Sequence, residues 1–352
     1  MKKNFLNKNS FRLQFSVLSF LILISGCSTC NKKNYEVDVS NISVELKTHR
    51  FDKDLMSLTQ LADSPPCEPM RTMKKEYGDF FSYYVHEILS FAEPDTSCDL
   101  ADSLQAFLFN PYFKSVFDTT CFHVYDNVDD LNKQLTEGFK HYIYYFPNAH
   151  IPAVVYYLNG PRAFTYGDRL LAIGLDWYLG SDYWYYHAVQ PAIPQFLIRR
   201  LRKEYIVPNA MSVMGTNLFP FIDDGKKCLD EMIYNGKILY LQQHILPQTP
   251  DSLITGFSQK DLEWMNDNEK EMWGYYLENK LLYETDALVY KKYVNDGPST
   301  TGMPPEAPGN TGSWIGWRII QKFMEENPDY TLQGLMNEQD AQKILTLSKY
   351  KP

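Results

Sequence analysis

The residues nearest to a catalytic motif are His86 and Glu87, which begin the sequence His86-Glu87-Ile88-Leu89-Ser90. In an H-E-x-x-H motif, two histidines four positions apart project from one helix face onto a single zinc ion. Ser90 stands where the second histidine would be, and the next histidine along the chain is His123. The pattern therefore favours a surface or capped helix residue at His86 over a metal ligand.

A second candidate site combines aromatic rings with two carboxylates. Asp176 and Asp182 lie six positions apart, and the intervening and following residues include Trp177, Tyr178 and Trp184. Glycoside hydrolases need two carboxylates, one as acid and one as base or nucleophile, and sugars stack on exposed rings. Aromatic side chains are more often buried, however, so the pattern favours a cluster that fills the core and folds over a sheet edge.

Cys27 is the residue with the clearest predicted chemistry. It follows a basic start and an apolar run from Phe15 to Ile24, which is too short to span a bilayer, and it ends the sequence Ile24-Ser25-Gly26-Cys27. This arrangement is typical of a bacterial lipoprotein signal. We predict that residues 1–26 are a signal peptide, that Cys27 is lipidated, and that residues 27–36 are an anchor and spacer. Acyl chains at Cys27 would hold the protein at a membrane surface.

The other cysteines predict a disulfide and not a metal site. Cys30, Cys67, Cys98, Cys121 and Cys228 have no zinc-ligand spacing, and an envelope location permits disulfides. Cys67 and Cys98 flank one predicted helix, so we expect them to pair. No cofactor is expected.

Charge excludes one class of partner. The 352 residues contain 34 Lys and Arg against 43 Asp and Glu, a net charge of −9, and loss of the signal peptide removes four more basic residues. Such a chain repels phosphate backbones, so nucleic acid is not an expected partner. The 44% apolar content is ample for a core.

Hydrophobic periodicity predicts a mainly helical α+β domain over residues 37–352 with a small central sheet. The two best strand candidates are Pro152–Leu158 and Leu170–Trp177, joined by a glycine-containing turn region. Residues 296–312 are expected to be a loop, because they hold four Gly and four Pro. The predicted helices are 69–91, 126–146, 194–203, 226–244, 258–283, 313–327 and 337–347.

Several stretches together resemble the gliding-motility lipoprotein GldB family. Besides Cys27, they are residues 50–55 (Arg-Phe-Asp-Lys-Asp-Leu), 77–81 (Tyr-Gly-Asp-Phe-Phe), 139–147, 172–180, 232–237 (Met-Ile-Tyr-Asn-Gly-Lys), 309–317 and Tyr350. The resemblance runs almost from end to end. It implies a non-catalytic envelope lipoprotein that supports gliding motility or the associated envelope and secretion machinery.

The second half is also similar, more remotely, to a family of predicted zinc-dependent peptidases with a zincin-like fold. The resemblance maps a strand and an edge strand onto Pro152–Leu158 and Leu170–Asp176, and a later ligand-bearing helix onto Lys226–Tyr240. Asn235-Gly236 replaces the acidic-Gly pair of that helix, and no histidine lies between His187 and His244. It therefore implies a degenerate zincin-like fold without metal ligands, with a peptide-binding groove beside the edge strand. The expected groove residues are Asp176, Tyr178, Asp182, Asn235 and Trp314.

Two alternatives remain open. One is a zinc peptidase with ligands drawn from His141, His150, His187 or His244, and the other is a glycan-binding lipoprotein that uses Trp184. The expected partners are the membrane, through Cys27, and envelope proteins. The residues after Cys27 contain no acidic cluster of the kind associated with surface export, which favours an outer-membrane anchor facing the periplasm.

Overall fold

Alternating side chains of two central strands divide the interior into two cores. The computed structural model describes residues 35–60, 67–222 and 226–352, so Cys27, Cys30 and the predicted signal peptide lie outside the described residues. Val154 and Tyr156 belong to one core, and Val155 and Tyr157 belong to the other. Side chains of a strand point alternately to its two faces, so this sheet is buried on both sides.

The sheet has four strands in the order β1-β2-β4-β3. β1 (Thr48–His49), β2 (Ala153–Tyr157) and β4 (Leu170–Gly174) are parallel, and β3 (Ala163–Tyr166) pairs antiparallel with β4. The two predicted strands are confirmed. The expectation that Leu170–Asp176 is an edge strand is wrong, because β3 forms from the predicted turn region and covers that side of β4.

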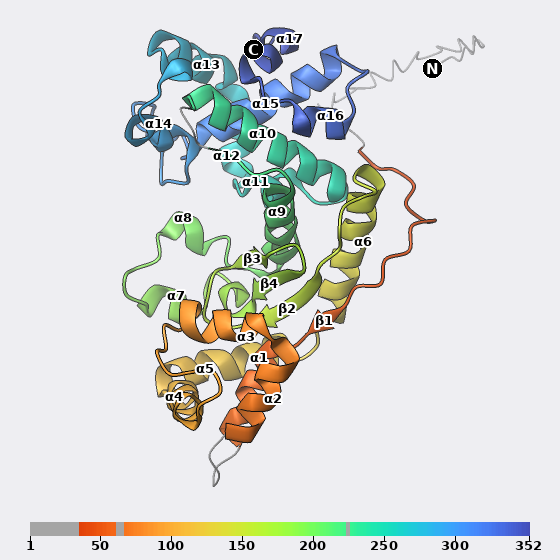
Figure 1. Ribbon diagram of the computed structural model, residues 1–352. Coiled ribbons are helices and arrows are strands. Elements are labelled where there is room, and N and C mark those ends of the chain that lie inside the picture. Colours follow the sequence, from red (N-terminus) through yellow and green to blue (C-terminus); the bar gives the residue numbers. More distant parts are fainter. Residues whose placement is uncertain (1–34, 61–66, 223–225) are drawn as a thin grey trace, which may run out of the picture. The chain divides into compact units, whose positions relative to one another are not determined.

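Helices from the first third of the chain pack on one face of the sheet (Figure 1). They enclose a core rich in Phe and Tyr, in which Phe51 contacts Tyr77, Phe80 and Tyr84 edge-on. The elements are α1 (Phe51–Ser57), α2 (Cys67–Tyr77), α3 (Asp79–Tyr83), α4 (Cys98–Phe109), α5 (Pro111–Asp118), and two π-helical turns, η2 (Tyr84–Ile88) and η3 (Thr119–Val124).

The other face of the sheet packs against α9 and α6, and the C-terminal helices pack on α9 and α6 farther from the sheet (Figure 1). Their buried residues form the larger core. The elements are α6 (Asp129–Tyr145), α9 (Ile206–Leu218), α10 (Cys228–Ile245), α11 (Asp251–Thr255), α12 (Gln259–Asp267), α13 (Glu269–Glu278), α14 (Ala287–Val294), α15 (Thr311–Glu326), α16 (Leu332–Asn337) and α17 (Ala341–Ser348). Short helices α7 (Trp184–Ala188) and α8 (Gln195–Ile198) follow the sheet.

The mainly helical α+β class with a small sheet is therefore confirmed, but three predicted helices are interrupted or end early, and a fourth, 337–347, begins only at Ala341. Helix 69–91 is interrupted at Gly78, whose φ of +54° is left-handed. Helix 258–283 divides at Asn268 into α12 and α13. Helix 194–203 ends at Ile198, because Arg202 forms an isolated β-bridge with Leu179. Apolar periodicity continues through each interruption, so it cannot reveal them.

The predicted Cys67–Cys98 disulfide is confirmed. It joins the first residues of α2 and α4, while Cys121 and Cys228 are free and buried.

Residues 35–352 cluster as one compact unit. None of the described helices combines the length and the apolar character needed to span a membrane.

Candidate functional site

Polar residues follow the carboxyl ends of the three parallel strands. Asp52 lies just after β1, Asn159 after β2 and Asp176 after β4. Asp176 is buried, and its Oδ2 accepts a hydrogen bond from the backbone N–H of Asn159 at 3.2 Å. Its Oδ1 has no hydrogen-bond partner among the described residues. Burial raises the pKa of Asp176 to about 7, so this carboxyl group can hold a proton near neutral pH.

The two π-helical turns bring further buried groups to this end of the sheet. Tyr84 begins η2; its side chain is fully buried and its hydroxyl has no partner among the described residues. Cys121, in η3, donates from Sγ to Oδ2 of Asp52 at 3.6 Å. Burial raises the pKa of Tyr84, and the charge of Asp176 adds a smaller increase. Burial likewise raises the pKa of Cys121, with a smaller contribution from Asp52. Both side chains therefore stay protonated, and Cys121 is an inert thiol.

Among the described residues, Arg50 is the one cation that forms an ion pair with a member of the group Asp52, Tyr84, Cys121, Asn159 and Asp176. Its Nε and Nη2 donate to the two carboxylate oxygens of Asp52 at 2.8 and 2.6 Å. This bidentate pair compensates the burial of Asp52. No cation among the described residues pairs with Asp176 in this way, and burial raises the pKa of its carboxyl group.

Tyr178 lies close to Asp176 but contributes a structural contact. Its side chain is 1% exposed, and its hydroxyl accepts a hydrogen bond from Asn209 of α9 at 2.8 Å. Tyr186 of α7 donates to the backbone oxygen of Asp176 at 2.6 Å. These bonds fix the turn after β4 to α7 and α9. They close this part of the interior around Asp176.

Asn235 and Trp314 lie together, on the crossing of α10 and α15. Asn235 donates to Ser313 Oγ at 2.9 Å, and the neighbouring Trp314 side chain is fully buried. The two helices approach so closely that a Cβ on Gly316 would lie 1.8 Å from the backbone oxygen of Met232. The five expected groove residues therefore fall into separate groups, and the groove that they were expected to line remains a prediction.

Asp182 and Trp184 are on the surface, unlike Asp176. Asp182 is exposed, and the Trp184 side chain is 46% exposed, with its ring edge-on to Tyr112 at 5.9 Å. The two carboxylates considered for sugar chemistry thus occupy different environments, one enclosed and one in solvent. Trp184 nevertheless offers an exposed ring.

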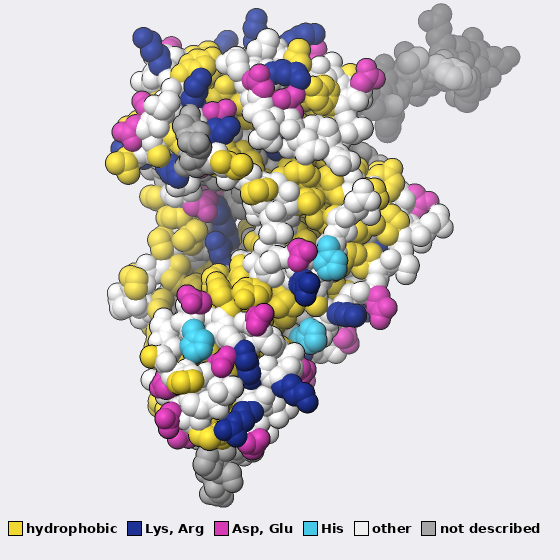
Figure 2. Space-filling model, in the orientation of Figure 1, with side chains coloured by type: hydrophobic (Ala, Val, Ile, Leu, Met, Phe, Trp, Pro, Cys, Tyr) yellow, Lys and Arg dark blue, Asp and Glu magenta, His cyan; other side chains and the backbone are white. Residues whose placement is uncertain are grey.

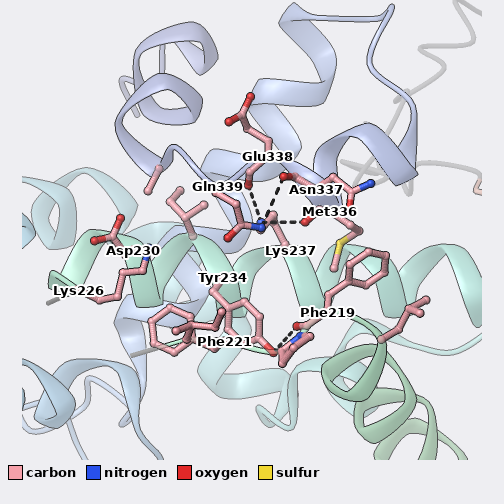
Figure 3. Close-up of a pocket in the computed structure, with 15 residues that line it drawn as sticks. Phe219, Phe221, Lys226, Asp230, Tyr234, Lys237, Met336, Asn337, Glu338 and Gln339 are labelled. Atoms are coloured by element: carbon pink, nitrogen blue, oxygen red, sulfur yellow. Dashed lines mark hydrogen bonds between the residues drawn. The ribbon is translucent and has the colours of Figure 1, made fainter. Parts of the chain in front are cut away.

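A pocket with a volume of about 510 Å³ lies beside Lys237 of α10 (Figure 3). The Lys237 side chain is buried, and its Nζ donates to the backbone oxygens of Met336 and Glu338 at 3.2 and 2.8 Å. Burial lowers its pKa to about 8. Phe221 and Tyr234 form the opposite, aromatic wall. Lys237 thus caps the carboxyl end of α16 and makes one wall of the pocket polar.

The histidines do not converge. His141 and His244 bond through Nδ1 to backbone oxygens of their own helices, and His187 bonds to Ser181 O. His86 contacts Phe91 O, in agreement with a capped helix residue. Burial lowers the pKa of His244 to about 4. Among the described residues, no three His, Cys, Asp or Glu side chains form a group that could hold a metal ion.

Sequence reasoning missed Tyr84, Cys121 and Lys237. Tyr84 belongs to the predicted helix 69–91 and Lys237 to the family-like stretch 232–237, but neither pattern indicates that a hydroxyl or an ammonium group is enclosed at that position. Arg50 and Asp52 had a signal, since they belong to the family-like stretch 50–55. Their roles depend on β1, a two-residue strand with no periodicity of its own.

Comparison with known proteins identifies one family. The model of the family described as gliding motility protein GldB matches residues 32–352. No curated protein and no solved structure is significantly similar to the chain.

Proposed function

Because the chain belongs to the GldB family of gliding motility proteins, we propose that it is a non-catalytic lipoprotein of the cell envelope that binds an extended segment of a partner protein. In this proposal Cys27 carries the lipid anchor, in the outer membrane and facing the periplasm. The partner belongs to the gliding machinery or to the envelope and secretion machinery associated with it.

The observation that carries the proposal is the hydrogen-bonding pattern of β3. Gly174 N donates to Arg162 O at 3.0 Å, so this pair is a hydrogen-bonded pair of the antiparallel ladder. Alternation then directs the backbone groups of Phe164 and Tyr166 to β4, and those of Ala163 and Thr165 away from it. No hydrogen bond joins these outward groups to another described residue.

An extended peptide satisfies such groups directly. Adding a strand beside β3 would pair its backbone with the N–H and C=O groups of Ala163 and Thr165. The side chains of β3 are already engaged: Phe164 packs on Tyr157, and Thr165 donates to Asn217 of α9 at 2.9 Å. The edge is therefore held in place on both faces, which lowers the entropic cost of pairing.

Support for a non-catalytic role comes from α9, which packs across β3 and β4. Its sequence, Ile206 to Leu218, contains no His, Cys, Asp or Glu. Asn209 and Asn217 instead form the polar contacts from this helix to Tyr178 and Thr165. This helix has no side chain that would serve as a usual zinc ligand or as a general base.

The test places a photo-crosslinking residue at Asp168, an exposed position in the turn after β3, in cells of a gliding host that lack their own copy. We expect a specific envelope adduct. Ala163→Pro removes an outward N–H without touching the ladder to β4, and should abolish both the adduct and the rescue of colony spreading. Ala163→Ser keeps the N–H and should retain both. Equal adducts from the two variants would contradict strand addition.

The zinc alternative has its own measurement. Elemental analysis of the purified chain after mild dialysis should give far less than one zinc per chain. About one equivalent, together with chelator-sensitive hydrolysis of casein, would replace the proposal with a metallopeptidase whose ligands include His141, His150, His187 or His244.

The exposed Trp184 ring supports glycan binding as the second candidate. It lies beside Tyr112, which is 38% exposed, and rings of this kind can stack on sugars. Retention on a polysaccharide column that is lost in Trp184→Ala and kept in Leu288→Ala would favour this candidate, since Leu288 is also exposed but not aromatic.

A further inference from the structure

A second pocket, with a volume of about 310 Å³, is bordered by α8, the first turn of α12 and the Gly- and Pro-rich loop before α15. In Figure 2 the surface between the positions of α8 and α12 is hollowed, and charged side chains line the hollow. Its polar lining includes Arg199, Arg200 and Lys260, and its rings include Phe196 and Trp264. The lining also includes the carboxylates of Asp261 and Glu306.

Arg200 is a fixed part of the wall. Its Nη1 donates to Asp296 Oδ2 at 2.7 Å, and its guanidinium lies against Gly256. Gly256 has a φ of +72°, and a Cβ at this position would be 2.8 Å from Cζ of Arg200. Glycine therefore makes room for this arginine, which ties α8 to α11 and to the loop.

The guanidinium of Arg199 has fewer polar contacts than that of Arg200. Its Nη2 is 3.5 Å from Asp261 Oδ2, an ion pair, but no described residue accepts a hydrogen bond from its guanidinium. The side chain is 31% exposed, and desolvation followed by the charge of Arg200 lowers its pKa. Five N–H donors thus border a pocket without an acceptor of good geometry.

Two further donors of the pocket have no hydrogen bond within the described part of the chain, namely Lys260 Nζ and the indole N–H of Trp264. The opposite wall is preformed. Thr300, which is buried in the loop, donates from Oγ1 to Pro308 O at 2.6 Å and contacts Thr311 Oγ1 at 3.0 Å. A rigid wall and unpaired donors favour binding of an anionic group.

We propose that this pocket binds the carboxylate of a peptide, with Arg199 as its main contact and Lys260 at the rim. A planar monoanion matches the guanidinium fork of Arg199. Asp261 and Glu306, which also line the pocket, disfavour a more highly charged group such as a phosphate dianion. Phe196 and Trp264 supply apolar surface for the residue that bears the carboxylate. This site is separate from strand addition at β3 and is tested separately.

The test uses small probes and the full chain in mild detergent. N-acetyl-phenylalanine represents a chain-terminal carboxylate, N-acetyl-aspartate amide represents an acidic side chain, and N-acetyl-phenylalanine amide is the neutral control. We expect saturation-transfer NMR to show binding of at least one carboxylate, about tenfold tighter than the neutral control. The probe that binds more tightly shows whether the site takes a chain-terminal carboxylate or an acidic side chain.

Variants then locate the site. Arg199→Gln should weaken carboxylate binding about tenfold, and Arg199→Lys, which keeps the charge without the fork, should weaken it less. Arg169→Gln, in the exposed turn between β3 and β4, is the matched control and should bind like the wild type. Equal unfolding midpoints would show that the variants are folded. Absence of binding, equal binding of acid and amide, or wild-type binding by Arg199→Gln would overturn the proposal.

Discussion

The carboxylate of Asp176 is held by the backbone N–H of Asn159 through one oxygen, while its other oxygen is enclosed without a partner among the described residues. The two residues follow neighbouring parallel strands, β4 and β2. Sheet pairing therefore places a carboxyl group, 17 positions distant in the chain, over the turn that follows β2. This relationship has a measurable consequence for the pH dependence of stability.

We expect the free energy of unfolding to fall as pH rises from about 4 to about 7. The pKa of Asp176 is 3.8 when unperturbed and about 7 in the fold, so the folded state binds the proton more tightly across this window. The loss is on the order of 4 kcal/mol for this group, and is absent below the unperturbed pKa. Urea unfolding at pH 5 and pH 8 measures the larger part of this loss.

Asp176→Asn should remove this component, because an amide does not titrate. Asp182→Asn, at an exposed position on the same segment, is the control and should keep the wild-type dependence. An Asp176→Asn chain that loses as much stability as the wild type between pH 5 and pH 8 would contradict the assignment.

The close crossing of α10 and α15 predicts a large effect at Gly316. Gly316→Ala would bring a Cβ to 1.8 Å from Met232 O, which forces the helices apart and should cost more than about 3 kcal/mol or prevent folding. Gly274→Ala, inside α13 with no atom within 4 Å of the new Cβ, should stabilise by about 0.5–1 kcal/mol. Thermal unfolding of both variants checks the contrast, and similar effects at the two sites would refute it.

Lys237→Met should destabilise the chain by about 1–3 kcal/mol, because Met336 O and Glu338 O lose their charged donor. The methionine retains most of the side-chain volume, so a cavity does not explain the loss. Lys226→Met, at the same pocket, is the control and should be nearly neutral. Denaturant titration of the two variants measures the difference between their free energies of unfolding. A neutral result for Lys237→Met would show that the cap contributes nothing to stability.

The Cys67–Cys98 disulfide closes a loop with a sequence separation of 31 residues. Its removal in Cys67→Ala/Cys98→Ala should cost about 2–4 kcal/mol, mainly because the unfolded chain gains freedom. A reducing agent should lower the unfolding midpoint of the wild type and leave that of the double variant unchanged. If the reductant shifts both midpoints equally, its effect does not arise from this disulfide.

Features of the fold that depend on neighbouring residues in the chain could be predicted from the sequence, whereas features that depend on pairing between distant segments could not. The strands at Pro152–Leu158 and Leu170–Trp177 were found because continuous apolar runs are typical of strands buried on both faces. β3 was missed because Ala163–Tyr166 is half-buried, short and next to glycine. β1 consists of two residues, and only its pairing with β2 defines it as a strand.

In the candidate site, too, local patterns indicated single residues but not the distant residues that contact them. Asp176 and Asn235 were singled out from local patterns and family-like stretches, but their neighbours Tyr84, Cys121 and Ser313 come from distant parts of the chain. Trp314, expected in a groove, is fully buried, because two glycines let α10 and α15 approach closely around it. Residue type alone does not distinguish a ring that binds a ligand from one that fills a core.

The class of fold, the expected Cys67–Cys98 pair and the family resemblance could be predicted from the sequence, because composition, periodicity and local motifs are properties of short stretches of chain. Which side chains are enclosed and which remain available for binding depends on the tertiary structure. The burial of Asp176, the outward groups of β3 and the placement of Arg199 beside Asp261 all depend on contacts between segments far apart in the sequence. Such contacts are set by packing of the whole chain, which no local pattern encodes.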